Sequence, residues 1–204
     1  KTDEIRLQSM PDLIQEIKNA GPFYITTKMD GTSATYCYEE NEFCVCSRNF
    51  KKKEDESNIY WKIARKYNLS EVLKEYKNLA ISGEIVGPSI QKNPVSLSEI
   101  DFFVFTVYDI SRSKRLGYYE TLSFCQTNNL RMVPLDSLWE DKDSLENFDF
   151  SLNVWLERAK GRYLNSNNPR EGIVIRPINP IYSPSLQGPL SFKVINNVYL
   201  LKEK

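Results

Sequence analysis

The fold is decided by residues 23–47, which read FYITTKMDGTSATYCYEENEFCVCS. Three runs rich in β-branched and aromatic residues, at 23–27, 33–38 and 43–47, are separated by short polar turns. Runs of this kind that follow one another through tight turns are typical of neighbouring antiparallel strands. The stretch therefore predicts the start of a β-sheet, with the polar segment 29–32 forming its first turn.

Outside this stretch, strands and helices mix without the regular alternation of a parallel βαβ protein. The segments with the strongest strand pattern are 79–86 and 102–110. Because hairpin-like neighbours dominate, the chain is expected to adopt an α+β fold with antiparallel β-sheets and helices beside them. Further strands are expected at 132–138, 172–176 and 190–195, helices at 11–17, 57–68, 70–76, 118–128 and 151–163, and a solvated acidic loop at 140–149.

The composition excludes several classes of function. The chain has 204 residues, enough for one domain with a buried core. Lysine plus arginine number 27 and aspartate plus glutamate number 27, so no overall positive field attracts the chain to nucleic acid, and any such contact needs a local patch. Histidine is absent, which excludes Ser-His-Asp and Cys-His catalysis and HExxH metal sites. An enzyme built from this chain must use lysine, carboxylates, cysteine, tyrosine or a bound ion.

The cysteines and the apolar runs indicate an intracellular protein. The four cysteines are too few and too unevenly spaced for a disulfide framework, and Cys44 and Cys46 are expected to be small buried residues of one strand. No apolar run approaches the roughly 20 residues of a membrane span. The first residues lack the apolar region of a signal peptide. We therefore expect no membrane partner.

The first candidate for chemistry is the motif Lys28-Met29-Asp30-Gly31. Its simplest interpretation is a tight turn with an exposed lysine before it. A lysine becomes a nucleophile only when burial and nearby cations favour its neutral form. The sequence offers such cations on other strands, at Arg48 and Lys193.

Two carboxylates stand in unusual strand settings. Glu84 follows Gly83, and Glu171 precedes Gly172 and an apolar run. A charged residue in an apolar strand is costly to bury unless it is paired, and the adjacent glycine allows a ligand or another backbone to approach closely. For each glutamate alone, a salt bridge at a strand edge is a simpler interpretation than a functional carboxylate.

Taken in chain order, these elements resemble the motif set of the covalent nucleotidyltransferase superfamily, which comprises ATP-dependent DNA and RNA ligases and mRNA capping guanylyltransferases. The resemblance spans nearly the whole chain and is strongest to RNA ligases, through segments 27–35, 102–110 and 191–197. It implies an adenylyltransferase (ATP-grasp-like ligase) fold, with two antiparallel β-sheets flanked by helices and the nucleotide between the sheets.

The resemblance also implies a domain organisation. Segment 1–8 is similar to the one that precedes the catalytic domain in RNA ligases whose OB domain comes first, and nine residues follow Ile195. We therefore expect residues 1–204 to form the nucleotidyltransferase domain, with an N-terminal OB domain outside this sequence.

The implied activity is ATP-dependent RNA ligation, an RNA-repair reaction with Mg²⁺ or Mn²⁺. Lys28 attacks the α-phosphorus of ATP and becomes a lysyl-AMP. The AMP then moves to an RNA 5′-phosphate. A 3′-hydroxyl finally attacks that phosphate and displaces the AMP, which seals the strand. The expected partner is RNA with such ends, including a nicked duplex, and the protein is expected to be a monomer.

The resemblance assigns roles to particular residues. Lys193 would contact the α-phosphate and Arg48 the ribose or a phosphate. Glu84 would accept a hydrogen bond from a ribose hydroxyl, and Tyr108 would stack on adenine. Phe105 is the second candidate for that stack, although its strand parity is expected to direct it to the core. The catalytic set is Lys28, Glu171, Lys193 and Arg48; the nucleotide-binding set is Thr27, Lys28, Gly31, Arg48, Glu84, Tyr108 and Lys193; the metal set is Glu171 and Asp30, acting through water.

One position departs from the pattern. The last motif of many relatives is Lys-x-Lys, whereas Ile195 follows Lys193-Val194 here. The missing positive charge would have to come from elsewhere, with Arg176 and Lys202 as candidates.

Three alternatives stay open. A DNA ligase would share every catalytic residue, and a capping guanylyltransferase would take GTP instead of ATP. A non-catalytic module that binds nucleotide or RNA would form no covalent AMP.

Overall fold

The computed structural model describes the backbone of residues 3–202 and the side chains of residues 3–201. These residues form two compact units. Unit 1 is the continuous segment Asp30–Val133, and unit 2 combines Asp3–Met29 with the chain from Pro134 onward. The first boundary falls between Met29 and Asp30, inside the lysine motif.

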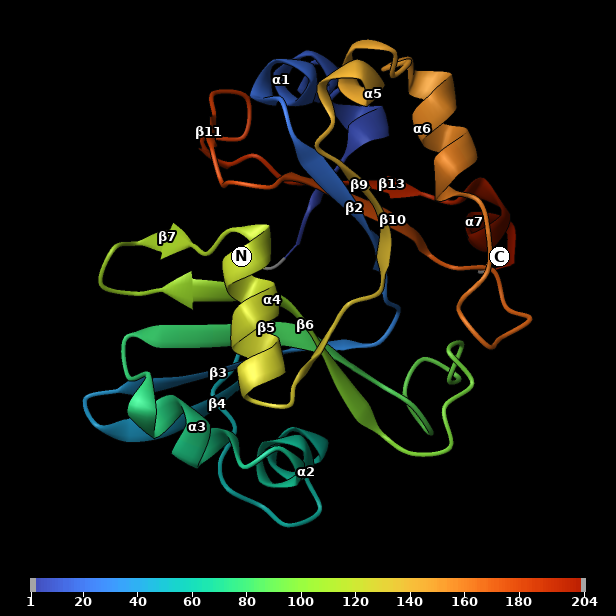
Figure 1. The fold of residues 1–204 in the computed structure, drawn as a ribbon. Helices are drawn as coiled ribbons and strands as arrows, with labels where there is room; N and C mark the ends of the chain where they lie inside the picture. Colours follow the sequence, from blue (N-terminus) through green and yellow to red (C-terminus); the bar gives the residue numbers. More distant parts are fainter. Residues whose placement is uncertain (1–2, 203–204) are drawn as a thin grey trace. The chain divides into compact units, whose positions relative to one another are not determined.

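Unit 1 is built on a six-stranded sheet (Figure 1). Its strands are antiparallel except β8, which pairs with β6 in the parallel sense. The spatial order is β4-β3-β5-β6-β7, with β8 beside β6. The strand bounds are β3 (Thr32–Glu39), β4 (Glu42–Ser47), β5 (Leu79–Val86), β6 (Asp101–Asp109), β7 (Lys114–Arg115) and β8 (Arg131–Met132).

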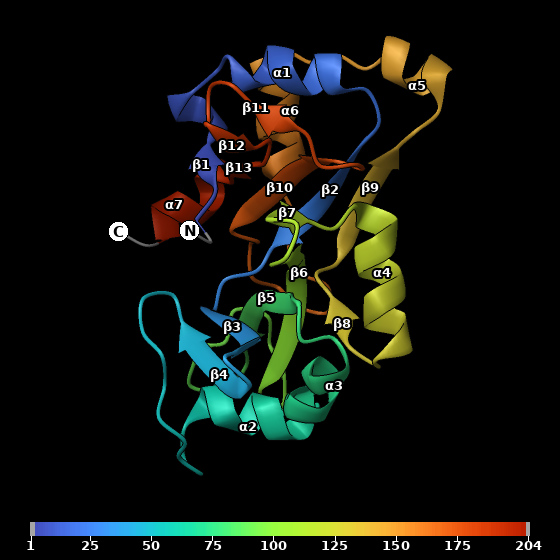
Figure 2. The same ribbon diagram turned by 90° about the vertical axis from the view of Figure 1, so that its left-hand side faces the viewer.

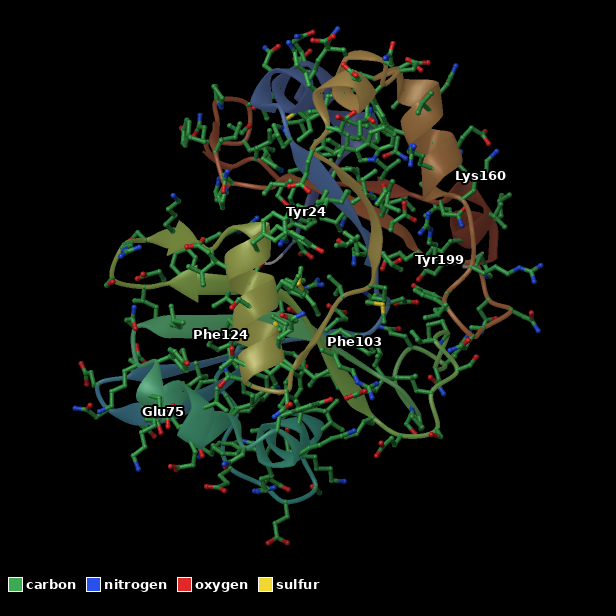
Figure 3. All side chains as sticks on the ribbon, in the orientation of Figure 1. Tyr24, Glu75, Phe103, Phe124, Lys160 and Tyr199 are labelled. Carbon is green, nitrogen blue, oxygen red and sulfur yellow. The ribbon has the colours of Figure 1, made fainter. Side chains whose placement is uncertain are left out.

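Three helices cover one face of this sheet: α2 (Ile59–Lys66), α3 (Leu69–Glu75) and α4 (Tyr118–Thr127). Their apolar side chains, including Phe124, which Figure 3 labels on α4, pack with alternate residues of the strands. Among those strand residues are Tyr36 and Phe102, which are fully buried. Since side chains alternate along a strand, the intervening residues lie on the opposite face of the sheet.

Unit 2 is built on a five-stranded sheet in the order β1-β13-β10-β2-β9. All pairs are antiparallel except β1 with β13. The strand bounds are β1 (Ile5–Arg6), β2 (Phe23–Lys28), β9 (Leu135–Trp139), β10 (Gly172–Pro177) and β13 (Phe192–Ile195), and β11 (Tyr182–Ser183) and β12 (Gly188–Pro189) form a separate hairpin.

One face of this second sheet is also covered by helices. Figure 2 shows α1, α5 and α6 gathered on one side of it. Phe23 and Ile25 of β2 pack there with Ile173 and Ile175 of β10 and with Trp155, all fully buried. The helices of unit 2 are the 3-10 turn η1 (Leu7–Ser9), α1 (Leu13–Ala20), α5 (Lys142–Glu146), α6 (Leu152–Ala159) and α7 (Asn197–Lys202).

The structure confirms the α+β class with two main sheets flanked by helices, and corrects it in detail. The runs 23–27 and 33–38, expected to be neighbours in one sheet, are β2 and β3 of different sheets, and only β3 and β4 form the expected antiparallel pair. The strand expected at 132–138 is likewise two strands, β8 and β9, which belong to different sheets. They separate at Pro134, which has no N–H to donate to a ladder. The acidic segment expected as a loop contains α5, capped by the Asp141 carboxylate, which accepts the Ser144 N–H. The helix expected at 57–68 is shorter, and its first residue follows Asn58, whose side chain caps α2 by accepting the Tyr60 N–H.

The cysteines form no disulfide: all four are free. Cys44 is buried as expected, whereas Cys46 is only half-buried. No helix within the described residues is long and apolar enough to cross a membrane.

Candidate active site

The lysine of the first motif lies against a carboxylate. Lys28 ends β2, and Glu171 immediately precedes β10, so the antiparallel register that sets Lys28 opposite Gly172 brings the two side chains together. The Lys28 Nζ lies 3.0 Å from the Glu171 Oε2, and the two side chains are 21% and 17% exposed. The interpretation of Lys28 as an exposed turn residue is therefore wrong.

Lys193 lies on the same face of the sheet. It pairs with Val174 of β10, which in turn pairs with Thr26 of β2, two residues before Lys28. Burial, and next the Lys28 ammonium, lower the pKa of Lys193, while the Glu171 carboxylate acts in the opposite direction. Two amines and one carboxylate thus share a partly desolvated surface, which suits a ligand of high negative charge.

The backbone on both sides of Glu171 is held by hydrogen bonds. The Glu171 N–H donates to the Tyr163 hydroxyl at 3.0 Å, and that hydroxyl donates to the Lys28 carbonyl at 3.2 Å. The Glu171 carbonyl accepts the Asn196 N–H at 2.9 Å, and the Asn196 amide donates to the Arg170 carbonyl at 3.0 Å. The carboxylate is therefore presented from a fixed backbone.

Gly172 is required by close packing. A Cβ added there would lie 2.1 Å from the Val194 carbonyl oxygen. The neighbouring Ile195 pairs with Gly172 and is 2% exposed. The expectation that the glycine beside Glu171 permits a close backbone approach is confirmed, and the approaching backbone is that of β13.

The cation beside Lys193 comes from an unexpected place. Strand β1 adds to the edge of the sheet so that Arg6 is in register with Lys193. Paired residues of adjacent strands project to the same face, so Arg6 extends the positive surface. The local sequence gives no signal for it, because a two-residue strand has no recognisable period.

Arg176 is not placed to replace the missing second lysine. Its side chain is 11% exposed, and it donates to the Glu4 carboxylate at 2.7 Å and to the Ser191 hydroxyl at 2.8 Å. The Arg176 guanidinium therefore binds the N-terminal segment through Glu4. The side chain of the other candidate, Lys202, lies outside the described residues.

Glu84 and Tyr108 lie in unit 1, on the sheet face opposite its helices. Glu84 is in register with Ser33 and Phe103, and Tyr108 is half-buried one strand away on β6. The hydroxyls of Thr35 and Ser82 are joined at 2.8 Å on this face. The sheet thus presents carboxylate, hydroxyl and aromatic groups on one side.

The remaining predicted residues occupy strand ends. Gly31 precedes β3 in such close packing that a Cβ would lie 2.2 Å from the Ile85 carbonyl oxygen. Asp30 is half-buried beside it, and Arg48 is exposed directly after β4. Thr27, in unit 2, donates its N–H to the Pro134 carbonyl at 2.9 Å.

The expectation that Phe105 faces the core is wrong. Strand β6 has a bulge there: Ser82 pairs with Thr106, but the next residue of β5, Gly83, pairs with Val104. Val104 and Val107 both belong to the core cluster, whereas Phe105 is half-buried and outside it. A bulge inserts one residue and so reverses the parity on which the expectation depended.

The carboxylates suit a metal ion held through water more than one chelated directly. No group of three or more His, Cys, Asp and Glu side chains gathers as a metal site within residues 3–201. Glu171 offers one carboxylate, already near an ammonium. Mg²⁺ keeps several of its waters and needs only one or two protein carboxylates, so these residues fit it.

This architecture is that of a nucleotidyltransferase domain. The model of the RNA ligase family matches residues 21–195, and the chain belongs to that family. A search of curated proteins finds no match.

Solved structures of Naegleria gruberi RNA ligase are similar to this chain. A mutant with ATP and Mn has 33% identity and a TM-score of 0.85, and covers 99% of this chain and 56% of its own. Another mutant, with AMP and Mn, has 33% identity and a TM-score of 0.84, over 99% and 57% of the two chains. The enzyme with PPi has 33% identity and a TM-score of 0.83, over the same shares. This chain therefore spans little more than half the length of that ligase.

Proposed function

We propose that this chain is the nucleotidyltransferase domain of an ATP-dependent RNA ligase. The observation that carries the proposal is the half-buried Lys28 amine, 3.0 Å from Glu171. The similar ligase has been solved with ATP, with AMP and with PPi. These are a nucleotide and the two fragments that its cleavage between the α- and β-phosphates yields.

In the first step, the neutral Lys28 Nζ attacks the α-phosphorus. A nitrogen–phosphorus bond forms, the bond to the bridging oxygen breaks, pyrophosphate leaves, and the amine releases its proton. Negative charge builds on the α-phosphate oxygens, and preorganised cations stabilise it. Lys193 is the nearest such cation by strand register, and Arg6 adds a second in place of the lysine that Ile195 replaces.

In the later steps, an RNA 5′-phosphate oxygen attacks the lysyl-AMP and takes the AMP. An RNA 3′-hydroxyl then displaces AMP and forms the phosphodiester. RNA with these ends, including nicked duplex RNA, is the proposed substrate, and the proposed active form is a monomer.

The remaining residues bind the nucleotide. Glu84 accepts a hydrogen bond from a ribose hydroxyl, Tyr108 stacks on adenine, and Arg48 contacts the ribose or a phosphate. Thr27 and Gly31 line the site beside the nucleophile. Glu171 and Asp30 would hold a divalent metal through its waters, and the metal would supply positive charge at the α-phosphate.

We also propose that an N-terminal OB domain accounts for part of the length by which the similar ligase exceeds this chain. Such a domain would help to hold pyrophosphate and RNA. The described chain is accordingly expected to form lysyl-AMP by itself but to seal RNA slowly.

Mass spectrometry tests the proposal. The chain is incubated with ATP and Mn²⁺ or Mg²⁺, and we expect a gain of one AMP that Lys28→Ala abolishes. Lys160→Ala is the matched control, because Lys160 is a half-exposed lysine of the same unit, paired with Glu157. Nucleotide binding without a mass gain would support the non-catalytic alternative, and a gain with GTP alone would support a guanylyltransferase.

The role of Glu171 has its own test. Glu171→Ala is expected to slow lysyl-AMP formation at least about tenfold, because the carboxylate is proposed to hold the metal ion that stabilises the phosphate charge. An unchanged rate would contradict the assignment.

A further inference from the structure

We propose that Tyr163 is a positioning residue for nucleotidyl transfer: its hydroxyl holds the backbone of Lys28 in place against the backbone of Glu171. This inference rests on the proposed function, since it concerns the pair that the function requires. Tyr163 belongs to no motif in the sequence, and its position follows only from the fold.

The contacts come from one buried oxygen. Tyr163 is 3% exposed, and its hydroxyl donates to the Lys28 carbonyl at 3.2 Å. The same oxygen accepts the Glu171 N–H at 3.0 Å. One atom therefore connects the chain at the nucleophile with the chain at the carboxylate.

The sheet itself does not hold this pair. The register between β2 and β10 ends at Lys28 and Gly172, so Glu171 lies just beyond the paired part of β10. The Tyr163 hydroxyl links the two chains at the point where the ladder of backbone hydrogen bonds stops. Without it, Glu171 would be held to β13 through Asn196 but less firmly to β2.

The tyrosine is anchored independently of the pair. Its N–H donates to the Asn168 carbonyl and its carbonyl accepts the Ser166 N–H, both at 3.2 Å, which closes a tight turn after α6. Arg170, 8% exposed, fixes the other end of this segment by donating to the Arg158 and Ala159 carbonyls. The hydroxyl is thus presented from a rigid segment.

Precise position matters because the reacting atoms must be about 3–3.5 Å apart and aligned, and a displacement of about 1 Å can cost about 100-fold in rate. Tyr163→Phe keeps the ring and removes the hydroxyl. We expect it to slow lysyl-AMP formation at saturating ATP by about 10- to 100-fold, with the KM for ATP unchanged, because the hydroxyl contacts backbone and not nucleotide.

The matched control is Tyr36→Phe. Tyr36 is fully buried in unit 1, and its hydroxyl donates to the Tyr60 carbonyl at 2.9 Å. Both variants lose a buried hydrogen bond to a backbone carbonyl, and both are expected to unfold at a lower temperature than the wild type. Measured well below both transitions, only Tyr163→Phe should lose rate.

Single-turnover adenylylation with labelled ATP separates the outcomes. A wild-type rate in Tyr163→Phe, a raised KM with unchanged kcat, or an equal rate loss in Tyr36→Phe would overturn the inference while leaving the proposed function intact. A wild-type chain that forms no lysyl-AMP would instead overturn the proposed function.

A second variant applies if Tyr163→Phe shows no unfolding transition. Asn196→Asp keeps the acceptor for the Val198 N–H but loses the donor to the Arg170 carbonyl. It disturbs the Glu171 backbone from the β13 side, so the same selective loss of kcat is expected. A folded Asn196→Asp protein with wild-type kcat would then count against the positioning role.

Discussion

At the scale of single residues, Lys193 is expected to lower the stability of the fold while it serves the proposed reaction. Its pKa is lowered by burial first and by the Lys28 ammonium second. A lysine with a lower pKa in the folded state destabilises the fold at neutral pH, because the unfolded chain binds its proton more tightly. An anionic ligand bound beside Lys193 would offset the cost of burying the Lys193 ammonium.

Lys193→Met is therefore expected to raise the midpoint of thermal unfolding at neutral pH while it slows lysyl-AMP formation about 100-fold. The gain in stability should shrink as the pH rises toward the ordinary lysine pKa of 10.5, since the wild-type amine then becomes neutral in both states. Calorimetry at several pH values, with a parallel adenylylation assay, measures both effects. A lower midpoint at neutral pH would contradict the prediction.

The residues differ in how far the sequence predicts them. Lys28 and Glu171 could be predicted to act together because their motifs, Lys28-x-Asp30-Gly31 and Glu171-Gly172, resemble in chain order the motif set of the nucleotidyltransferases. Arg6 and Tyr163 could not, because each meets its partners only through tertiary contacts, by the addition of β1 to an edge and by a turn after α6.

At the scale of elements, strand β1 depends on one buried ion pair. Burial opposes the charge of Arg176, but Glu4 and Tyr24 together outweigh burial and raise the pKa of that guanidinium. The Glu4 and Arg176 side chains are 9% and 11% exposed, so loss of either partner leaves the other nearly dry.

Glu4→Ala is expected to lower the free energy of unfolding by about 3–5 kcal/mol, because it leaves a buried arginine without its carboxylate. Hydrogen exchange should also become faster at the amides of β1 and its partner β13. The control is Glu157→Ala, which breaks the exposed pair with Lys160 and should cost less than about 1 kcal/mol. If urea denaturation gave equal losses of unfolding free energy for the two variants, the buried pair would stabilise the fold no more than the exposed pair.

Elements with a clear period were predictable, and those shaped by one irregular residue were not. The strand at 79–86 was predicted with its exact bounds. The bulge at Phe105 depends on the register that β5 imposes, which no pattern within β6 reveals. Pro134 ended the expected strand at 132–138, and the sequence alone did not show that the two halves join different sheets.

At the scale of the whole molecule, the half-buried Cys37 and the buried Cys125 are expected to make the fold sensitive to alkali. Burial raises the pKa of Cys37 from 9.0 to about 11 and that of Cys125 from 9.0 to about 12. The folded state therefore holds these protons more tightly than the unfolded state. Their contribution to stability is complete below pH 9.0 and is lost as the pH rises toward about 11 and 12.

The midpoint of thermal unfolding should consequently fall steadily above about pH 9. Cys125→Ala should begin from a lower midpoint, because it leaves a small cavity beside α4, but should fall less steeply with pH. A series of melting curves in matched buffers measures the two slopes. Identical slopes would show that Cys125 does not contribute to the loss of stability at high pH.

The division of the chain has a consequence for synthesis on the ribosome. Unit 1 is one continuous segment and can fold as it emerges, whereas β2 leaves the ribosome long before β9, β10 and β13 have been made. Until then the apolar strand β2 has no neighbouring strands in the nascent chain. The Lys28 amine at the end of that strand has neither Glu171 nor Lys193 beside it. The Lys28 amine therefore gains both neighbours only after translation has passed Lys193. We expect a prematurely terminated product to form no lysyl-AMP and to bind chaperones.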